Sequence, residues 1–215
     1  MKKTNIVLVV LTIAVVALGI ALLRVTTFKG ETIKTETPAF QGEDMGNFRA
    51  ISFAEGTQMD PFRFFAGDGL LLAAGNIKAS NAMTIGWGTF GVLWGEPVAT
   101  VYVREDRFTH KFTEESDYFT IMSFQDKKVL AYMGSHSGRD ADKAKELGLH
   151  TYYTKHGAPY YAEADTVIEC RKLAATTFAD ENFCDSVPRR MYANTNGAYH
   201  TQYIGKVVGA WAKKQ

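Results

Sequence analysis

Residues 81–109, NAMTIGWGTFGVLWGEPVATVYVREDRFT, decide the fold class. The string GWGTFG at positions 86–91 matches the G-x-G-x-x-G pattern of dinucleotide-binding folds. In those folds the motif opens a helix whose amino terminus holds a pyrophosphate. Gly91, Gly95 and Pro97 follow within a few residues here and exclude such a helix. The glycines are therefore predicted to mark a strand end, a bend and a turn.

The segments on either side of this stretch continue the β pattern, because they are short, rich in β-forming residues and bounded by Gly, Pro, Asn or Asp. The predicted strands are Leu70–Ala74, Met83–Trp87, Val98–Val103, Tyr118–Phe124, Val167–Leu173 and Tyr203–Val208. The predicted helices are Phe108–Glu115, Lys127–Met133 and Ala141–Leu147. Helices do not alternate regularly with strands, which excludes a doubly wound sheet. The pattern favours a small antiparallel barrel with short helices at its edges.

Length and composition limit the classes of function that the protein can have. The chain has 215 residues, a net charge of +1 and 46% hydrophobic residues, which suits one folded domain or at most two small ones. This near-neutral charge excludes a nucleic-acid-binding protein that works by bulk positive charge. Cys170 and Cys184 cannot form a disulfide framework or a C-x-x-C motif, and a single disulfide between them would require an exported domain.

The common catalytic and metal-binding signatures are missing from the sequence. The five histidines have neither H-x-x-x-H nor H-E-x-x-H spacing, which disfavours a metal site. No G-x-S-x-G motif occurs, and Cys170 lies inside an apolar predicted strand. No residue is therefore assigned as catalytic.

The amino terminus is predicted to be separate from the folded domain. Ile6–Leu23 is a run of 18 uncharged residues, which as a helix would span about 27 Å, close to the hydrocarbon thickness of a bilayer. No A-x-A-like cleavage site follows it, which favours an uncleaved anchor over a cleaved signal peptide. We expect a membrane anchor or signal segment at 1–24, a polar tether at 25–45 and a folded domain at 46–215.

The side of the membrane is less sharply indicated, because basic residues flank the apolar run on both sides. A short basic start followed at once by an apolar run is typical of an export signal. The sequence therefore favours a domain that lies on the extracytoplasmic side of the membrane or is exported.

Three segments carry polar groups suited to a ligand. Arg104, Arg107 and Thr109 offer donors for a phosphate, although the arginines could instead pair with the acidic residues between them. Residues 134–143, GSHSGRDADK, form a polar loop that runs into a predicted helix, which suits an anion or simple helix capping. Residues 81–87, NAMTIGW, could accommodate a planar ligand or form an ordinary strand entry.

With these segments in order, the sequence resembles the flavin reductase-like family, the FMN-binding split-barrel group that includes flavoredoxin. The resemblance is carried by AGN at 74–76, residues 81–99, VREDRFT at 103–109, DYFTIMSF at 117–124, GSHSGRDADK at 134–143, GAPYY at 157–161, ECRKL at 169–173 and AYHTQYIGKV at 198–207.

The resemblance implies a mainly β protein, a split β-barrel with Greek-key connections and short peripheral helices, here preceded by one transmembrane segment. It further implies noncovalent FMN near the interface of a homodimer. Implied cofactor-binding residues are Asn81, Met83, Thr84 and Trp87 along the ring and ribityl chain, Arg104, Arg107 and Thr109 at the phosphate, and Ser135, Ser137, Gly138 and Lys143 closing the site.

The implied function is an oxidoreductase in which bound FMN carries hydride or electrons from NAD(P)H to an acceptor. If the domain lies outside the cytoplasm, NAD(P)H is not expected there. A membrane-tethered FMN electron carrier served by a protein donor is then the alternative. A degenerate barrel without a cofactor is the third hypothesis.

Overall fold

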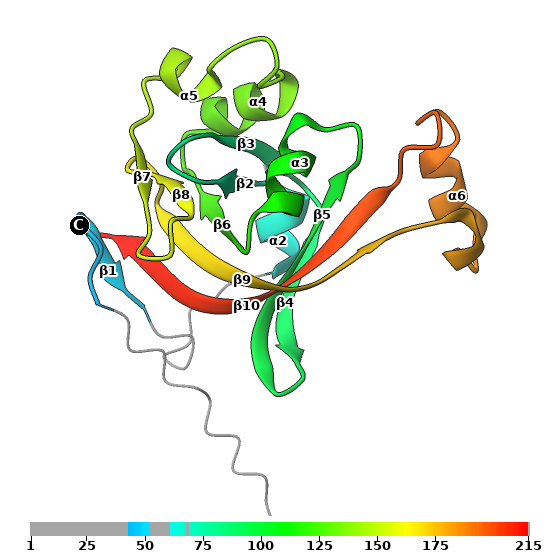
Figure 1. Ribbon diagram of the computed structural model, residues 1–215, viewed down its shortest axis with the longest axis horizontal. Coiled ribbons are helices and arrows are strands. Elements are labelled where there is room, and N and C mark those ends of the chain that lie inside the picture. Colours follow the sequence, from blue (N-terminus) through cyan, green and yellow to red (C-terminus); the bar gives the residue numbers. More distant parts are fainter. Residues whose placement is uncertain (1–42, 52–60, 68, 215) are drawn as a thin grey trace, which may run out of the picture. The chain divides into compact units, whose positions relative to one another are not determined.

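The computed structural model describes residues 43–51, 61–67 and 69–214 (Figure 1). The strands are β1 (Phe48–Ala50), β2 (Leu70–Gly75), β3 (Ser80–Ile85), β4 (Gly88–Leu93), β5 (Glu96–Arg104), β6 (Tyr118–Ser123), β7 (Thr151–Tyr153), β8 (Pro159–Tyr161), β9 (Thr166–Thr177) and β10 (His200–Lys213). The helices are α2 (Pro61–Ala66), α3 (Phe108–Glu115), α4 (Lys127–Ser135), α5 (Lys143–Glu146) and α6 (Ser186–Tyr192), with a 3₁₀ turn η2 at Asp180–Asn182.

The expected anchor at 1–24 and nearly all of the expected tether lie outside the described residues. Within the described ranges, no helix has both the length and the apolar character needed to cross a bilayer.

The main sheet is antiparallel and runs in the order β3-β2-β6-β9-β10-β5-β4, with β1 paired to β10 at one end of that long strand. The two ends of the path, β3 and β4, share no ladder in the part of the chain that the structure describes. Strands β7 and β8 form a separate two-stranded sheet. The prediction of a mainly β domain with a few short helices is confirmed.

The GWGTFG string forms no helix, as predicted. Its last four residues begin β4, and the β4–β5 hairpin turns at Trp94 and Gly95, whose φ angles are 55° and 73°. Two consecutive left-handed residues define the tight two-residue turn whose twist matches the flanking strands.

The third predicted helix is shorter than expected. Instead of spanning Ala141–Leu147, helix α5 begins at Lys143, and Asp142 caps it by accepting a hydrogen bond from the Lys145 backbone N–H at 3.2 Å. Ser137 and Asp140 have the spacing of a capping box in the sequence, but they do not cap this helix. The Ser137 hydroxyl instead accepts from the Arg139 backbone N–H at 3.2 Å, which forms a turn rather than a helix start.

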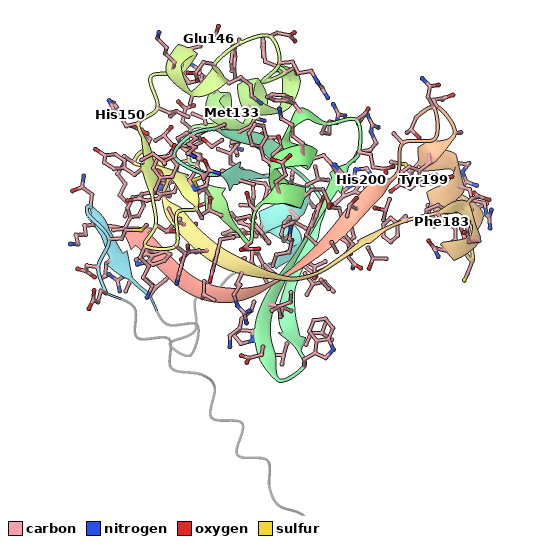
Figure 2. All side chains as sticks on the ribbon, in the orientation of Figure 1. Met133, Glu146, His150, Phe183, Tyr199 and His200 are labelled. Carbon is pink, nitrogen blue, oxygen red and sulfur yellow. The ribbon has the colours of Figure 1, made fainter. Side chains whose placement is uncertain are left out.

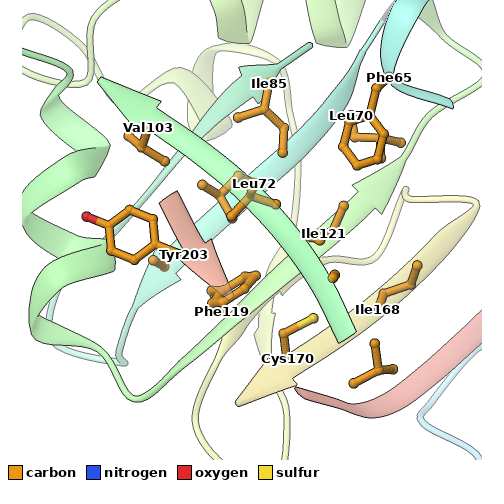
Figure 3. Packing of buried hydrophobic residues seen from close by; sticks show 14 of the residues in the cluster. Phe65, Leu70, Leu72, Ile85, Val103, Phe119, Ile121, Ile168, Cys170 and Tyr203 are labelled. Atoms are coloured by element: carbon orange, nitrogen blue, oxygen red, sulfur yellow. The ribbon is translucent and has the colours of Figure 1, made fainter. Parts of the chain in front are cut away.

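One face of the curled sheet encloses the main core (Figure 3). Leu72 of β2, Val103 of β5, Phe119 of β6, Cys170 of β9 and Tyr203 of β10 all point into it and are at most 1% exposed. Because side chains alternate along each strand, the opposite face is free to bind helix α4 and strand β8 around a second cluster that includes Met122. Both cysteines are free thiols, and burial raises the pKa of Cys170.

The close approach of strands inside the barrel yields a stability prediction. A Cβ on Gly205 of β10 would stand 2.7 Å from the Cys170 Cβ and 2.7 Å from the Phe119 ring. We expect Gly205→Ala to lower the free energy of unfolding by about 1–3 kcal/mol, the usual cost of overpacking a core. Urea denaturation measures this change. Gly91→Ala is the control, because a Cβ there meets nothing within 4 Å, and equal stability of the two variants would contradict this packing.

Candidate functional site

A small polar cavity lies where strand β3, the start of helix α3 and the loop between α4 and α5 meet. Its volume is about 150 Å³. Eight of the predicted site residues line it, namely Asn81, Met83, Arg107, Thr109, Ser135, Ser137, Gly138 and Lys143. The structure therefore brings together three segments that are far apart in the sequence.

A larger cavity of about 560 Å³ adjoins the first. The two share a wall made by Asn81, Phe108, Met133, Gly138, Arg139 and Lys143. Binding sites for cofactors commonly enclose about 300–1,000 Å³. The two cavities together reach that size, whereas the small one alone does not.

Lys143 is the central charged group of this wall. Its side chain is 5% exposed, and its ammonium group donates to the backbone oxygens of Ala82 at 2.8 Å and Met133 at 2.9 Å. An ammonium group carries three N–H donors, so one remains for a ligand. No carboxylate among the described residues forms an ion pair with it. Burial lowers the pKa of Lys143 to about 8, because a charged amine is poorly solvated there.

Asn81 and Thr109 are joined across the site. The Asn81 amide donates to the Thr109 hydroxyl at 2.7 Å, and Thr109 is 1% exposed. Gly138 of the loop packs so closely against this pair that a Cβ there would overlap the Asn81 Oδ1 atom and approach the Phe108 ring to 2.9 Å. The loop thus crosses the boundary between the two cavities at a position where only glycine fits.

The two arginines of the predicted phosphate clamp occupy different environments. Arg107 lines the small cavity with half of its side chain exposed, and its Nε lies 3.7 Å from Asp106. Arg104 does not line the cavity; it donates two hydrogen bonds to Asp106, at 2.8 and 2.9 Å. This hydrogen bonding lowers the pKa of Asp106. Arg107 thus faces the cavity, as a phosphate contact would require, whereas Arg104 pairs with an acidic neighbour.

Thr84 and Trp87, which the sequence also predicted, line neither cavity. The Thr84 hydroxyl donates to the Leu130 backbone oxygen at 2.6 Å, so it ties β3 to helix α4. The Trp87 ring packs against the His200 ring, with centroids 4.5 Å apart. In Figure 2, His200 lies toward the arm that carries Tyr199 and Phe183, apart from Met133 at the cavities.

His200 was not among the predicted site residues. Its Nδ1 lies 2.8 Å from the Tyr192 hydroxyl, and burial together with the nearby arginines lowers the pKa of His200 to about 4. The ring is therefore neutral at pH 7, and the pair with Trp87 is an aromatic contact rather than a cationic one.

The residues assigned to the cofactor omitted three members of the shared wall, namely Phe108, Met133 and Arg139. Arg139 donates to the Asp106 backbone oxygen at 3.1 Å, and its guanidinium lies 5.3 Å from the centre of the Phe108 ring. The polarity of the 134–143 loop was the available signal for Arg139. Phe108 gave no such signal, because an aromatic residue at a helix start is most simply explained by packing.

Gly138 gives a prediction about the site. We expect Gly138→Ala to displace the Asn81 side chain from Thr109 and to weaken flavin binding by about 1 kcal/mol or more, roughly fivefold. Titration of the protein with FMN, followed by quenching of flavin fluorescence, measures the effect. Gly91→Ala is the matched control, and an unchanged affinity in Gly138→Ala would show that the loop does not act on the site.

The fold and site define a mainly β domain with a pocket rich in hydrogen-bond donors. A family model described as "Flavin reductase like domain" matches residues 62–215. The chain belongs to this family, and its fold is flavin reductase-like. Among curated proteins, none matches the sequence.

Several solved structures share the fold. Flavoredoxin from Methanosarcina acetivorans is 21% identical, with a TM-score of 0.54 and 68% of each chain covered. A flavin reductase-like FMN-binding domain from Shewanella baltica is 20% identical, with a TM-score of 0.53 and 78% of each chain covered. An FMN-binding protein from Thermus thermophilus with bound p-hydroxybenzaldehyde is 23% identical, with a TM-score of 0.54, covering 77% of this chain and 82% of that one.

Proposed function

We propose that this protein is a flavin-dependent oxidoreductase that binds FMN across the two adjoining cavities and passes hydride or electrons from NAD(P)H to an acceptor. The observation that carries the proposal is the shared wall, where the buried ammonium group of Lys143 has no counter-charge among the described residues and lines a cavity that Arg107, Thr109 and Ser137 also border. A nucleotide with a dianionic phosphate and a polar ring edge supplies the charge that this wall lacks. The fold we propose around the site is the split barrel with Greek-key connections.

The residues present suit the group in chemistry and in space. Arg107 and the Ser137 hydroxyl would hold the phosphate, and Lys143 would donate its remaining N–H to an acceptor atom of the flavin. Asn81 and Thr109 would keep the wall between them rigid through their own hydrogen bond. FMN, when bound, supplies the redox chemistry, and no side chain of the protein is assigned a proton-transfer step.

A colour test decides whether the protein binds flavin. The purified full chain, incubated with excess FMN and then desalted, is expected to retain flavin absorbance. A colourless protein would contradict the proposal and would support a barrel without a cofactor.

The proposed electron donor, NAD(P)H, is tested separately. Anaerobic addition of NADH or NADPH to the flavin-loaded protein is expected to bleach the flavin within the mixing time of a stopped-flow instrument. The second candidate function is a membrane-tethered FMN electron carrier, which the apolar run Ile6–Leu23 favours because NAD(P)H is not expected outside the cytoplasm. A flavin that dithionite bleaches but NAD(P)H does not would support the carrier.

We also propose that the chain forms a homodimer and that residues 1–24 anchor it to a membrane, with the folded domain on the extracytoplasmic side. The dimer would be observed as twice the chain mass in sedimentation. A reporter fused to the carboxyl terminus, active on only one side of the membrane, would test the orientation.

A further inference from the structure

The apex of the β4–β5 hairpin is unusually apolar. Val92 is 77% exposed, Leu93 38% and Trp94 63%. Large hydrophobic side chains are exposed at eight described positions, and these three are the only ones that are consecutive. Single exposed apolar residues need no explanation, but a contiguous group marks a contact surface.

Turn geometry does not account for these residues. The left-handed conformation at Trp94 favours Asn, Asp or Gly, and a bulky aromatic is disfavoured there. Trp94 is 63% exposed at the turn of a hairpin that extends away from the body of the domain (Figure 1). An exposed Trp at a turn that favours small polar residues points to a contact outside the domain.

The hairpin also lacks unpaired charge near its apex. No ionisable residue occurs from Gly88 to Gly95. The nearest acidic residue, Glu96, is neutralised by Lys206 of β10 at 2.7 Å. The apex can therefore leave water without burying a charge that has no partner.

We propose that the side chains of Val92, Leu93 and Trp94 insert into the surface of a lipid bilayer. The indole of Trp, with an apolar body and one N–H donor, is the side chain that concentrates at the boundary between lipid headgroups and hydrocarbon. Three side chains at a protruding tip suit insertion into a fluid layer. They suit a protein interface less well, since stable interfaces bury about 800 Å² on each partner.

The inference rests on the proposed membrane anchor, and the chain is long enough for both contacts. Nineteen residues, 24–42, separate the apolar run from Glu43, where the described part of the chain starts. A chain of that length spans at most about 60 Å. An anchor in the same bilayer raises the local concentration of lipid at the hairpin. Three apolar side chains can then maintain a contact that would be too weak to persist without the anchor.

This contact would orient the site. The α4–α5 loop that borders the cavities lies at the end of the domain opposite the hairpin apex (Figure 1). With the apex in the bilayer, the cavities open away from the lipid, toward soluble donors and acceptors.

The test places a nitrobenzoxadiazole probe at the apex of the full chain. Val92→Cys is labelled in a Cys184→Ser background, because Cys184 is exposed and Cys170 is buried. The protein is reconstituted into vesicles of phosphatidylcholine and phosphatidylglycerol, with and without doxyl-labelled lipid. Val187→Cys is the matched control, since that valine is 57% exposed on α6.

We expect blue-shifted emission and at least twofold quenching by doxyl lipid at position 92, and neither effect at position 187. Adding Leu93→Ser and Trp94→Ser should reduce the quenching at position 92 to the control level.

Unquenched emission from vesicle-bound protein would overturn the hairpin contact alone. A blue shift without doxyl quenching would assign the apex to a second copy or another protein instead. A chain that does not float with the vesicles would overturn the anchor and the hairpin contact together. Flavin absorbance, read on unlabelled protein in the same vesicles, reports separately on the cofactor.

Discussion

Lys143→Met is expected to weaken FMN binding by roughly 10- to 150-fold. A hydrogen bond to a charged group contributes about 1.5–3 kcal/mol, which corresponds to that range. Lys143 is well placed to have this effect, because its ammonium group is buried and donates only to backbone oxygens among the described residues. Methionine keeps the length and apolar volume of the side chain while removing the charge. Fluorescence titration measures the dissociation constant.

The pH dependence of binding identifies the charge as the cause. Burial lowers the pKa of Lys143 to about 8 in the free protein, and a bound anion would raise that pKa again. The protonated form therefore binds more tightly. Between about pH 7, above which the phosphate is dianionic, and pH 8 the affinity stays nearly constant. Above pH 8 it falls by up to tenfold for each pH unit, until the pKa of the complex is reached.

The control for this experiment is the variant itself. In Lys143→Met the decline above pH 8 should vanish, and circular dichroism should show an unchanged fold. A decline of the same size in both proteins would assign the titration to another group and would remove Lys143 from the site.

The second large effect is expected at Arg107. Its guanidinium lines the small cavity, and its Nε lies 3.7 Å from Asp106, too far for a hydrogen bond, so Arg107→Ala should raise the dissociation constant for FMN by roughly 10- to 150-fold. Raising the salt concentration should diminish the difference from the original protein, because half of the side chain is exposed. An affinity equal to that of the original protein would contradict a phosphate contact.

Arg104 is expected to act through Asp106. Because Arg104 pairs with Asp106 at 2.8 Å, its removal leaves a carboxylate free at the cavity, which repels a phosphate. Arg104→Ala should thus weaken binding in the original protein but not in an Asp106→Asn background. This double-mutant cycle separates a positioning role from direct contact. Equal losses in both backgrounds would show that Arg104 touches the ligand.

Much of the fold could be read from local patterns. The strands predicted around Leu70–Ala74, Val98–Val103 and Tyr118–Phe124 correspond to β2, β5 and β6, because buried runs of β-formers between turn residues are a strong local signal. The prediction omitted β1, β4, β7 and β8. Strand β4 is mostly exposed and rich in glycine, and the other three have only three residues each, so neither periodicity nor length distinguished them.

The candidate site was also predictable in part, because some of its segments carry a strong local signal. Donor-rich segments around Arg107 and Ser137 stand out in the sequence, and the structure brings both to one cavity. The sequence could not show that the Thr84 hydroxyl donates to the Leu130 backbone oxygen, or that the Trp87 ring packs against the His200 ring. Each of those partners is distant in the chain.

The sequence by itself determined the mainly β class, the family and the residue types available to a phosphate, because turn residues, β-formers and arginines act through neighbours a few positions away. Only the tertiary structure decided which donors remain free. In the part of the chain that the structure describes, Lys143 has no counter-charge and Arg104 pairs with Asp106. The physical reason is that solvation and pairing of a charge depend on every group within a few ångströms, and most of those groups come from other strands.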